Sequence, residues 1–479
     1  MMLPKANKES YEVKTAWRNI LMGTPLRKCL STMEGKRVDS YLQHMDALGY
    51  TVVSGKVGFP AAAYAIKKIT MTLQMAEHYK LNIIMLLLDM DSCFPNMTKR
   101  MCAWLLTWWG LPADVVARYL EYNADNVAVM MEFKAIATSR QSPVAADFHN
   151  LWDWVDKYAV YFKSLGTTQG CNSSLTLVGL CLRSLTHQWE VAGKGFDWPV
   201  QDITLSECMP NPNMTEVGVG YIDDGAALAG GGHSSKRKSI DQTIGDMMHI
   251  ATICAVWAQY FVPMGKGKCK VVGSLFDLKG NKINVDAKFP VYTSEGMEEI
   301  PLQPFDNGVQ LLGVTIGGNE SYKADLTRVN EREVLLDVWL EDHNICRQVK
   351  TNFYVYSILA LRKYFSGKTY VPGKVIQSET SHFTKQFKTI LDIVPSTANA
   401  ALYAHNEDFG CGYPNFQDCQ DGSDASRAIA LANANTLWAR GFFNMLLNFT
   451  RQRNGIKQIT NGTSLFFDWD ISNISWSRL

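Results

Sequence analysis

The tetrapeptide Tyr-Ile-Asp-Asp at 221–224 constrains this chain more than any other feature. It follows a short apolar run at 217–220 and precedes a second one at 225–229. This pattern predicts strand, tight turn and strand, with both acids at the tip. Adjacent carboxylates repel each other unless a cation lies between them, and a divalent metal ion is the candidate. Aspartates also favour turns for backbone reasons, so a metal site here needs a third carboxylate and a nucleotide-handling loop nearby.

A further acid follows the continuous apolar run at 82–88, which is typical of a strand buried on both faces. The run ends at Asp89, and Asp91 comes two residues later. A carboxylate at the end of a buried strand is held rigidly, which suits a metal ligand; the alternative is that it begins a solvent-facing turn. Phosphoryl transfer by two metal ions needs at least two carboxylates that converge on ions roughly 3.5–4 Å apart. The order of Asp89, a glycine-rich loop, a helix and the pair at 223–224 fits that requirement.

Bulk composition indicates a globular protein. The chain has 479 residues, of which 47% are hydrophobic and 19% charged, so we expect two or three domains with a real core. The 11 cysteines form no CxxC pair and no zinc-like cluster, which favours free thiols in a reducing compartment. No signal-peptide-like segment and no run of membrane-spanning length is present, so we expect a soluble, intracellular protein without a membrane partner, in either nucleus or cytoplasm.

The net charge of +1 conceals a basic segment. Between residues 347 and 388, eight Lys or Arg residues stand against one acid, Glu379, and aromatic residues are interleaved with them. Such a face suits a nucleic-acid backbone, although charge runs also occur on ordinary solvated helices. We expect nucleic-acid contacts here, with Arg362 and Lys363 as candidates.

The hydrophobic periodicities predict a mixed α+β chain. Alternation of a strand, helix, two strands, helix and strand predicts a split βαβ core with helical additions. Beyond residue 325 the sequence is largely helical, until a Gly/Asn/Asp-rich stretch near 405–425. Strands are expected at 82–88, 126–133 and on both sides of the acidic turn, a loop at 166–170, and helices at 61–80, 97–109, 112–122, 142–163, 172–191 and 239–258.

Together these motifs resemble the reverse transcriptase family, closest in style to the enzymes of non-LTR retrotransposons and group II introns. Leu-Asp-Met-Asp-Ser-Cys-Phe at 88–94 resembles the first palm motif, and Gly-Thr-Thr-Gln-Gly-Cys-Asn-Ser-Ser at 166–174 resembles the Gln-Gly motif. The acids at 221–224 resemble the tyrosine–aspartate–aspartate motif. Gly-Lys-Gly-Lys-Cys at 265–269 is similar to the lysine loop, and Leu-Leu-Gly-Val at 311–314 is similar to the primer-grip turn.

Looser likenesses extend the resemblance to roughly residues 14–440. Trp-Arg-Asn-Ile at 17–20 is similar to a finger segment, and Phe-Gly-Cys-Gly-Tyr-Pro at 409–414 is similar to the glycine-rich stretch after the thumb. The chain departs from the family at Ser174-Leu175, where the family has serine–proline, and residues 141–163 lengthen the segment before the Gln-Gly motif.

The resemblance implies the right-hand polymerase fold, of class α+β, with fingers, a palm built on a split βαβ, ferredoxin-like core, and a helical thumb. Residues 1–80 would form the fingers and 81–325 the palm, with 97–165 partly completing the fingers. Residues 326–455 would form the helical thumb and post-thumb segment, and 456–479 a tail.

The implied activity is that of an RNA-directed DNA polymerase, which extends a primer on an RNA or DNA template with dNTPs. The resemblance makes Asp89, Asp223 and Asp224 the catalytic residues and the ligands of two Mg²⁺ ions, with Mn²⁺ as a substitute. Two other readings are an RNA-dependent RNA polymerase and a catalytically silent, domesticated relative that binds nucleic acid. The aromatic Phe94, the tyrosine at 221 and the retention of all three acids argue for the first reading.

The resemblance also assigns binding roles. Phe94 would lie under the sugar of the incoming nucleotide and exclude a 2′-hydroxyl, or else pack as a core aromatic. Arg18 would hold the triphosphate with its planar fork, and Lys268 would act near the departing pyrophosphate or lie as a surface lysine. The other nucleotide-binding residues implied are Lys14, Gln169 and Gly170, and those for primer and template are Tyr221, Leu312, Gly313, Arg362 and Lys363.

Overall fold

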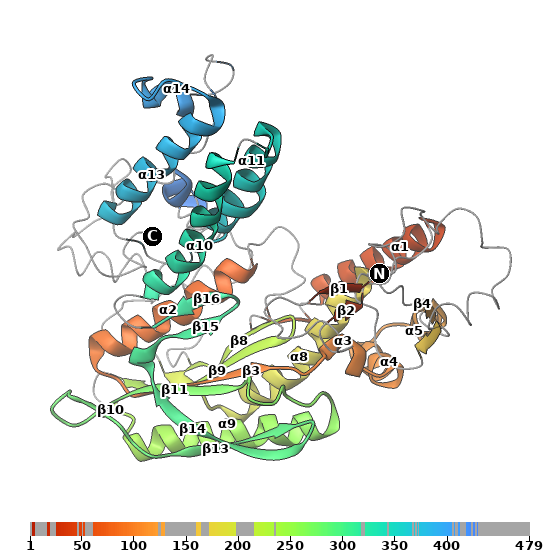
Figure 1. Ribbon diagram of the computed structural model, residues 1–479. Coiled ribbons are helices and arrows are strands. Elements are labelled where there is room, and N and C mark those ends of the chain that lie inside the picture. Colours follow the sequence, from red (N-terminus) through yellow and green to blue (C-terminus); the bar gives the residue numbers. More distant parts are fainter. Residues whose placement is uncertain are drawn as a thin grey trace.

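The structure is a computed structural model (Figure 1) in which the described part of the chain forms a mixed α+β fold around a curled sheet. None of the described helices is both long enough and apolar enough to cross a membrane. The described residues are 2–4, 17–19, 25–45, 47–49, 51–52, 61–122, 126–129, 160–163, 172–197, 215–233, 236–317, 321–342, 344–365, 373–404 and short pieces between 368 and 429.

The centre of the fold is strand β3 (Ile83–Asp89), which pairs antiparallel with β9 (Asp224–His233) on one side and β11 (Lys270–Phe276) on the other. Strand β8 (Gly218–Tyr221) pairs with the outer edge of β9. Helix α8 (Asn172–Ala192) precedes the β8–β9 hairpin. Helix α9 (Ile240–Tyr260) then connects β9 to β11. The strand–helix–strand–strand–helix–strand order predicted from sequence is therefore present, with the four strands side by side in the order β11-β3-β9-β8.

Each face of this sheet covers a separate core, because successive side chains of a strand point to opposite faces. The odd-numbered side chains of β3 from Ile83 to Leu87 pack with helix α2 (Ala61–Tyr79) and with the C-terminal helices. The even-numbered side chains from Ile84 to Leu88 pack with α8 and α9. In Figure 1, α2 and α9 lie on opposite sides of the sheet. Burial on both faces explains why 82–88 is uniformly apolar.

Helix α9 shows how local sequence sets an element's start. Ser239 caps it: its hydroxyl accepts from the Gln242 amide, and the Gln242 side chain accepts from the Ser239 amide, which makes a capping box. The remaining helices of this half are α1 (Pro25–His44), α3 (Cys93–Asn96), α4 (Lys99–Trp108) and α5 (Ala113–Tyr122). The remaining strands of the main sheet are β6 (Phe196–Asp197), β7 (Thr215–Glu216), β10 (Lys236–Arg237), β12 (Lys282–Ile283), β13 (Lys288–Thr293) and β14 (Gly296–Pro304).

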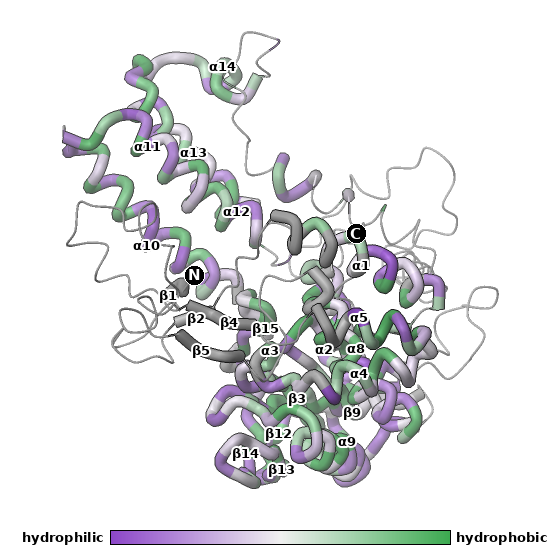
Figure 2. The backbone as a smooth tube through the Cα atoms, turned by 90° about the vertical axis from the view of Figure 1, so that its right-hand side faces the viewer, coloured by the Kyte–Doolittle hydropathy of each residue, from purple (hydrophilic) through white to green (hydrophobic). Residues whose placement is uncertain are grey.

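Helices α10 to α13 form a bundle on the α2 side of the sheet, which we call the C-terminal bundle. Polar and apolar residues alternate along these helices (Figure 2), as expected for helices with one buried face. A small hairpin, β15 (Val309–Leu311) and β16 (Val314–Ile316), joins the sheet to this bundle. The bundle comprises α10 (Ser321–Glu341), α11 (Arg347–Phe353), a π-helical segment (Tyr354–Leu359), α12 (Ala360–Phe365) and α13 (Gly373–Leu391), and α14 (Asn399–Tyr403) follows it.

One element was predicted wrongly from sequence. Residues 142–163 were expected to be helical, but Val160–Lys163 forms strand β5, which pairs antiparallel with β4 (Asn126–Val129). The sequence Val-Tyr-Phe is β-branched and aromatic, so it fits a pleated surface better than a helix. The rest of that predicted helix and the predicted loop at 166–170 lie outside the described residues.

Candidate active site

Three acids predicted from sequence meet at one end of the sheet. Asp89 is the last residue of β3, and its Cα partner across the ladder is Asp224, the first residue of β9. Asp223 lies in the turn between β8 and β9, and its carbonyl accepts from the Met90 amide at 3.0 Å. Asp224 therefore belongs to the strand, whereas the sequence placed both acids at the tip. The pairing of β3 with β9 brings together residues that are far apart in the chain.

The turn that carries Asp223 is strained. Tyr221 and Asp224 form its closing pair, and Ile222 has a φ of 55°. A β-branched residue rarely adopts positive φ, and such conformations cost on the order of 1–3 kcal/mol where they occur. Strain of this kind concentrates at functional sites, since the surrounding structure must hold it in place.

Electrostatics sets these carboxylates apart from ordinary surface acids. Burial, and then the charges of Asp223 and Asp89, raise the pKa of Asp224 to about 7, while Lys268 acts in the opposite direction. Burial followed by the charges of the acids at 223 and 224 also raises the pKa of the Tyr221 phenol. This end of the sheet therefore concentrates negative charge in a partly desolvated place, which is where a cation binds most favourably.

Lys268 supplies one cation at the site. Its ammonium lies 2.7 Å from Asp89 Oδ1. Burial lowers the pKa of Lys268, but the hydrogen bond to Asp89 and the charges of Asp89, Asp91 and Asp223 raise it, and the net direction is upward. The preceding loop is anchored to the same strand, because the Gly265 amide donates to the Asp89 carbonyl at 2.8 Å. The predicted lysine loop is thus placed beside the acids.

The donor set fits a magnesium ion in its chemistry. Mg²⁺ prefers carboxylate oxygens, and a cation would offset the charges of Asp223 and Asp89, which after burial are the causes of the raised pKa of Asp224. Among the described residues, however, no group of three or more His, Cys, Asp or Glu side chains is gathered about one point as a ready metal site. The three carboxylates are neighbours through their backbones, and their side chains would have to turn toward a bound ion.

The raised pKa of Asp224 predicts how stability depends on pH. Below about pH 4 the group is protonated in the folded and unfolded chain and contributes nothing. From there to about pH 7 the folded chain keeps a proton that the unfolded chain has lost, so the free energy of unfolding falls as pH rises. We expect D224N to be more stable than the wild type at pH 8 without divalent metal, by on the order of 2 kcal/mol after allowance for solvent screening.

Urea unfolding between pH 4 and pH 8 in the presence of a chelator measures this difference. The advantage of D224N should shrink toward zero at pH 4. D286N, an exposed change on the surface, is the matched control and should run parallel to the wild type. A gap between D224N and the wild type that is equal at pH 4 and pH 8 would contradict the electrostatic account.

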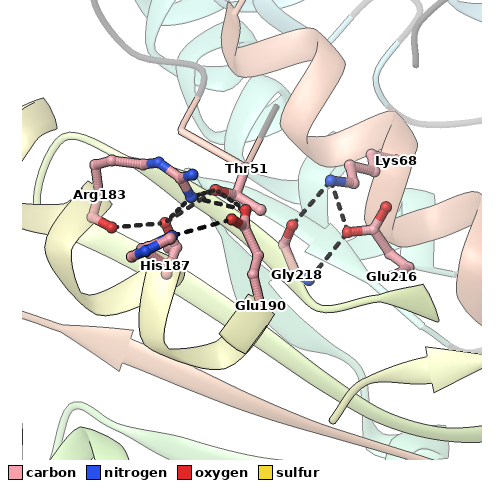
Figure 3. A network of polar contacts seen from close by, with 8 residues as sticks. Thr51, Lys68, Arg183, His187, Glu190, Glu216 and Gly218 are labelled. Atoms are coloured by element: carbon pink, nitrogen blue, oxygen red, sulfur yellow. Dashed lines mark hydrogen bonds and ion pairs between the residues drawn. The ribbon is translucent and has the colours of Figure 1, made fainter. Parts of the chain in front are cut away.

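Strand β8, which leads into the acidic turn, is fixed at its start by a buried ion pair (Figure 3). The Lys68 ammonium of α2 lies 2.7 Å from Glu216 Oε1, and neither side chain is exposed. The two residues also bind the backbone of Gly218. The Lys68 ammonium donates to the Gly218 carbonyl at 2.9 Å, and the Gly218 amide donates to the Glu216 carboxylate at 3.0 Å. Burial lowers the pKa of Lys68 and raises that of Glu216, while each charge opposes the shift of the other. The ion pair thereby ties β8 to α2.

A second polar network holds the same strand two residues later (Figure 3). The Gly220 amide donates to the Thr51 carbonyl at 2.8 Å. Arg183 of α8 donates to the Thr51 hydroxyl at 3.3 Å and to Glu190 at 2.7 Å. A Cβ on Gly220 would lie 2.3 Å from Leu182, so glycine lets α8 pack directly on the strand. The hairpin that carries the acids is therefore held from two helices.

These supporting residues were not singled out from sequence, although a signal was present. Lys68 lies inside the apolar pattern of helix 61–80, and Glu216 directly precedes the apolar run at 217–220. Charged residues are almost never fully buried unless they are paired. A lysine on the apolar side of one element and a glutamate beside another could therefore have been matched as partners.

The other predicted site residues are placed as follows. Phe94 lies on α3, just after β3, and is partly buried against the α8–α9 core. Leu312 and Gly313 form the turn between β15 and β16, and both Leu312 and Tyr221 pack against the other core. Arg18 lies in strand β2 (Trp17–Asn19), which pairs with β1 (Met2–Pro4). Lys14, Gln169 and Gly170 lie outside the described residues.

The structure contradicts the prediction for one residue that was expected to contact nucleic acid. Arg362 was expected on an exposed basic face, but it is 7% exposed and forms ion pairs with Glu379 and, at 3.9 Å, with Glu333. Its guanidinium also lies 5.5 Å from the centroid of the Phe383 ring. A planar, weakly hydrated guanidinium suits such a buried pair, so Arg362 stabilises the C-terminal bundle. Lys363, its neighbour in sequence, is exposed as predicted.

The basic face is also smaller than the sequence suggests. The ammonium groups of Lys350 and Lys368 donate to backbone carbonyls within the C-terminal bundle, and that of Lys388 donates to the carbonyls of Pro395 and Thr397, which follow α13. These lysines cap carbonyl groups and are less available to a ligand than lysines that extend into solvent.

No protein-family model matches this chain, and no curated protein matches it in sequence. Solved structures similar to it include the telomerase of Candida albicans bound to a TWJ fragment of telomeric RNA, with 12% identity, a TM-score of 0.28, and coverage of 85% of this chain and 57% of that one. The apo telomerase of Candida tropicalis is 10% identical, with a TM-score of 0.32 and coverage of 87% of this chain and 61% of that one. The telomerase of Candida tropicalis in complex with a TWJ fragment of telomeric RNA is 11% identical, with a TM-score of 0.29 and coverage of 88% of this chain and 56% of that one. This chain thus spans somewhat more than half the length of those proteins.

Proposed function

We propose that this chain is an RNA-directed DNA polymerase that extends a primer by nucleotidyl transfer. The observation that carries the proposal is the alignment of Asp89 with Asp224 across β3 and β9, with Asp223 in a strained turn beside them. Three acids whose backbones are fixed at the end of a buried sheet suit a reaction in which positioning and charge contribute most of the catalysis.

In this proposal Asp89, Asp223 and Asp224 hold two Mg²⁺ ions. When bound, such ions lower the pKa of an attacking hydroxyl and stabilise the charge on a leaving oxygen. Lys268 adds a positive charge beside Asp89, where the phosphates of an incoming nucleotide would lie. Tyr221 and the Leu312–Gly313 turn would support the primer end from the opposite side.

The proposed function also assigns the palm, thumb and fingers of a polymerase to parts of this fold. The β3–β8–β9–β11 sheet with α8 and α9 would be the palm of a right-hand polymerase, and residues 81–325 its span. The C-terminal bundle would form the first part of the thumb, at 326–455, although its first helix, α10, already begins at Ser321. Residues 1–80 with part of 97–165 would form the fingers. The exposed lysine at 363 would face the template–primer duplex.

Primer extension tests the proposal. The wild-type chain would be incubated with a primed RNA template or a primed DNA template, with dNTPs or rNTPs, and with Mg²⁺ or Mn²⁺. Extension of the RNA-templated primer with dNTPs is the expected result. Extension with rNTPs alone would instead indicate an RNA polymerase, and binding without extension under any condition would indicate a catalytically silent nucleic-acid-binding protein.

Phe94 provides a prediction about sugar selection. If its ring lies against the nucleotide sugar, F94A should admit ribonucleotides, because the space that a 2′-hydroxyl needs becomes open. We expect the preference for dNTP over rNTP, as a ratio of kcat/KM, to fall by about tenfold or more. F94Y keeps the ring and should keep the preference.

Unchanged sugar selectivity in an F94A protein that still extends primers would return Phe94 to a packing role in the core. The fold must be checked alongside, since Phe94 is partly buried. Far-ultraviolet circular dichroism and dNTP extension by F94A provide that check.

A further inference from the structure

The turn between β15 and β16 has a demanding geometry. Leu312 has a φ of 50° and Gly313 a φ of 73°, so both central residues of this two-residue turn lie in the left-handed region. Such turns match the twist of a hairpin, but leucine adopts that conformation only at a cost. Contacts from outside the hairpin are therefore needed to hold Leu312 in place.

Two helices of the C-terminal bundle provide these contacts. The hydroxyl of Tyr364, on α12, donates a hydrogen bond to the Leu312 carbonyl. Arg328, on α10, donates to the Gly313 carbonyl at 2.7 Å. Both carbonyls of the turn are thus bonded by side chains from the bundle. A third contact secures the next strand, because the buried Asp325 accepts from the amide of Thr315 at 3.1 Å and from its hydroxyl at 2.9 Å.

Tyr364 also lies close to the acidic hairpin. Tyr364, Leu312 and Tyr221 pack against the same hydrophobic core. A Cβ on Gly313 would lie 3.7 Å from the Tyr364 hydroxyl oxygen, so the tyrosine covers the turn. Burial, and then the electrostatic influence of Tyr221 and Asp224, raise the pKa of the Tyr364 phenol, which keeps it a hydrogen-bond donor well above neutral pH. A single side chain thereby joins the bundle to the turn and lies within electrostatic range of the acidic hairpin.

The ammonium of Lys368 completes the arrangement. It lies 3.4 Å from the centroid of the Tyr364 ring, a cation–π contact, and donates to the Tyr364 carbonyl. The ring is thus held by a contact separate from that of its hydroxyl, and its χ angles are restricted by both. A side chain held in this way can transmit the position of α12 to the turn.

We propose that Tyr364 is a positioning residue: its hydroxyl locks the Leu312–Gly313 turn to the C-terminal bundle and so fixes where the primer 3′ end lies relative to Asp223 and Asp224. This inference rests on the proposed function, since it assigns the turn to the primer. Nothing in the sequence motifs marks Tyr364 for this role. The role follows from the bond to a turn carbonyl made by a helix that is 52 residues further along the chain.

The test compares Y364F with Y356F. Both remove one phenolic hydroxyl from the same bundle, but Tyr356 is 78% exposed. Loss of one hydrogen bond to a backbone carbonyl should raise the KM for primed template by about fivefold in Y364F. The kcat with saturating primer should change less than the KM, because the acids themselves are intact. A 2-aminopurine at the primer 3′ terminus should also report greater mobility in Y364F, and Y356F should match the wild type in every assay.

Equal KM values and equal terminal fluorescence in Y364F and Y356F, with the wild type active, would overturn this inference and leave the proposed function standing. Absence of extension by the wild type would instead overturn the proposed function. In that case hydrogen exchange at the amides of residues 312–314, measured without nucleic acid, decides about the lock itself. Faster exchange in Y364F than in Y356F supports it, and equal exchange overturns it.

Discussion

D223N should lose primer extension while keeping its fold. Asparagine has the shape of aspartate but not its charge, so it cannot neutralise a bound metal ion as a carboxylate does. We expect the rate to fall by at least about a thousandfold, which corresponds to about 4 kcal/mol of transition-state stabilisation. The fold should not suffer, because removing one charge relieves the repulsion that raises the pKa of Asp224.

Two measurements separate these effects. Single-turnover extension with Mg²⁺ measures the chemical step, and urea unfolding measures stability. D286N removes one exposed carboxylate elsewhere and should behave as the wild type in both. If D223N extends primers at a rate within about tenfold of the wild type, which is about 1.4 kcal/mol, Asp223 is not a metal ligand in the reaction. If D223N is much less stable than the wild type, its lost activity is no evidence for catalysis.

The sequence predicted the framework of this site well because the relevant signals are local. A continuous apolar run that ends in Asp89 indicates a doubly buried strand, and paired acids between two short apolar runs indicate a hairpin. What brings Asp89 next to Asp224 is the pairing of two strands that are far apart in the chain. The order of motifs supplied that long-range information through the family resemblance, and the periodicities alone did not.

The environment of individual side chains was harder to predict. Arg362 was assigned to an exposed basic face because it lies among lysines, yet helix packing turns it inward to Glu333 and Glu379. Charge content along a segment does not show which face of a helix each residue occupies when the segment changes from α11 through a π-helical stretch to α12. The wider turn of the π-helical stretch shifts the helical phase.

The buried ion pair between Lys68 and Glu216, at the start of β8, gives the second prediction with a large effect, which is on stability. K68M leaves the Glu216 carboxyl in the core without its cation, and E216Q leaves the Lys68 ammonium there without its anion. Breaking a fully buried pair from one side costs about 3–5 kcal/mol, because the remaining charge must be neutralised or hydrated. Each single variant should therefore unfold at much lower urea concentration than the wild type. K36M, which changes an exposed lysine on a helix, is the matched control.

The double variant K68M/E216Q should recover most of the lost stability, because two neutral side chains of similar size then share the site and the introduced amide oxygen is still able to accept from the Gly218 amide.

The pH dependence of the free energy of unfolding gives a second, independent test of the ion pair. In K68M the pKa of Glu216, already raised by burial, rises further, so the folded chain holds a proton that the unfolded chain loses above about pH 4. The deficit of K68M relative to the wild type must then grow from pH 5 to pH 8, whereas that of the double variant, which has no carboxyl group at position 216, must not grow. Parallel curves for K68M and K36M would show that the ion pair does not hold β8, and the Thr51–Arg183–Glu190 network would then be the polar support of that strand.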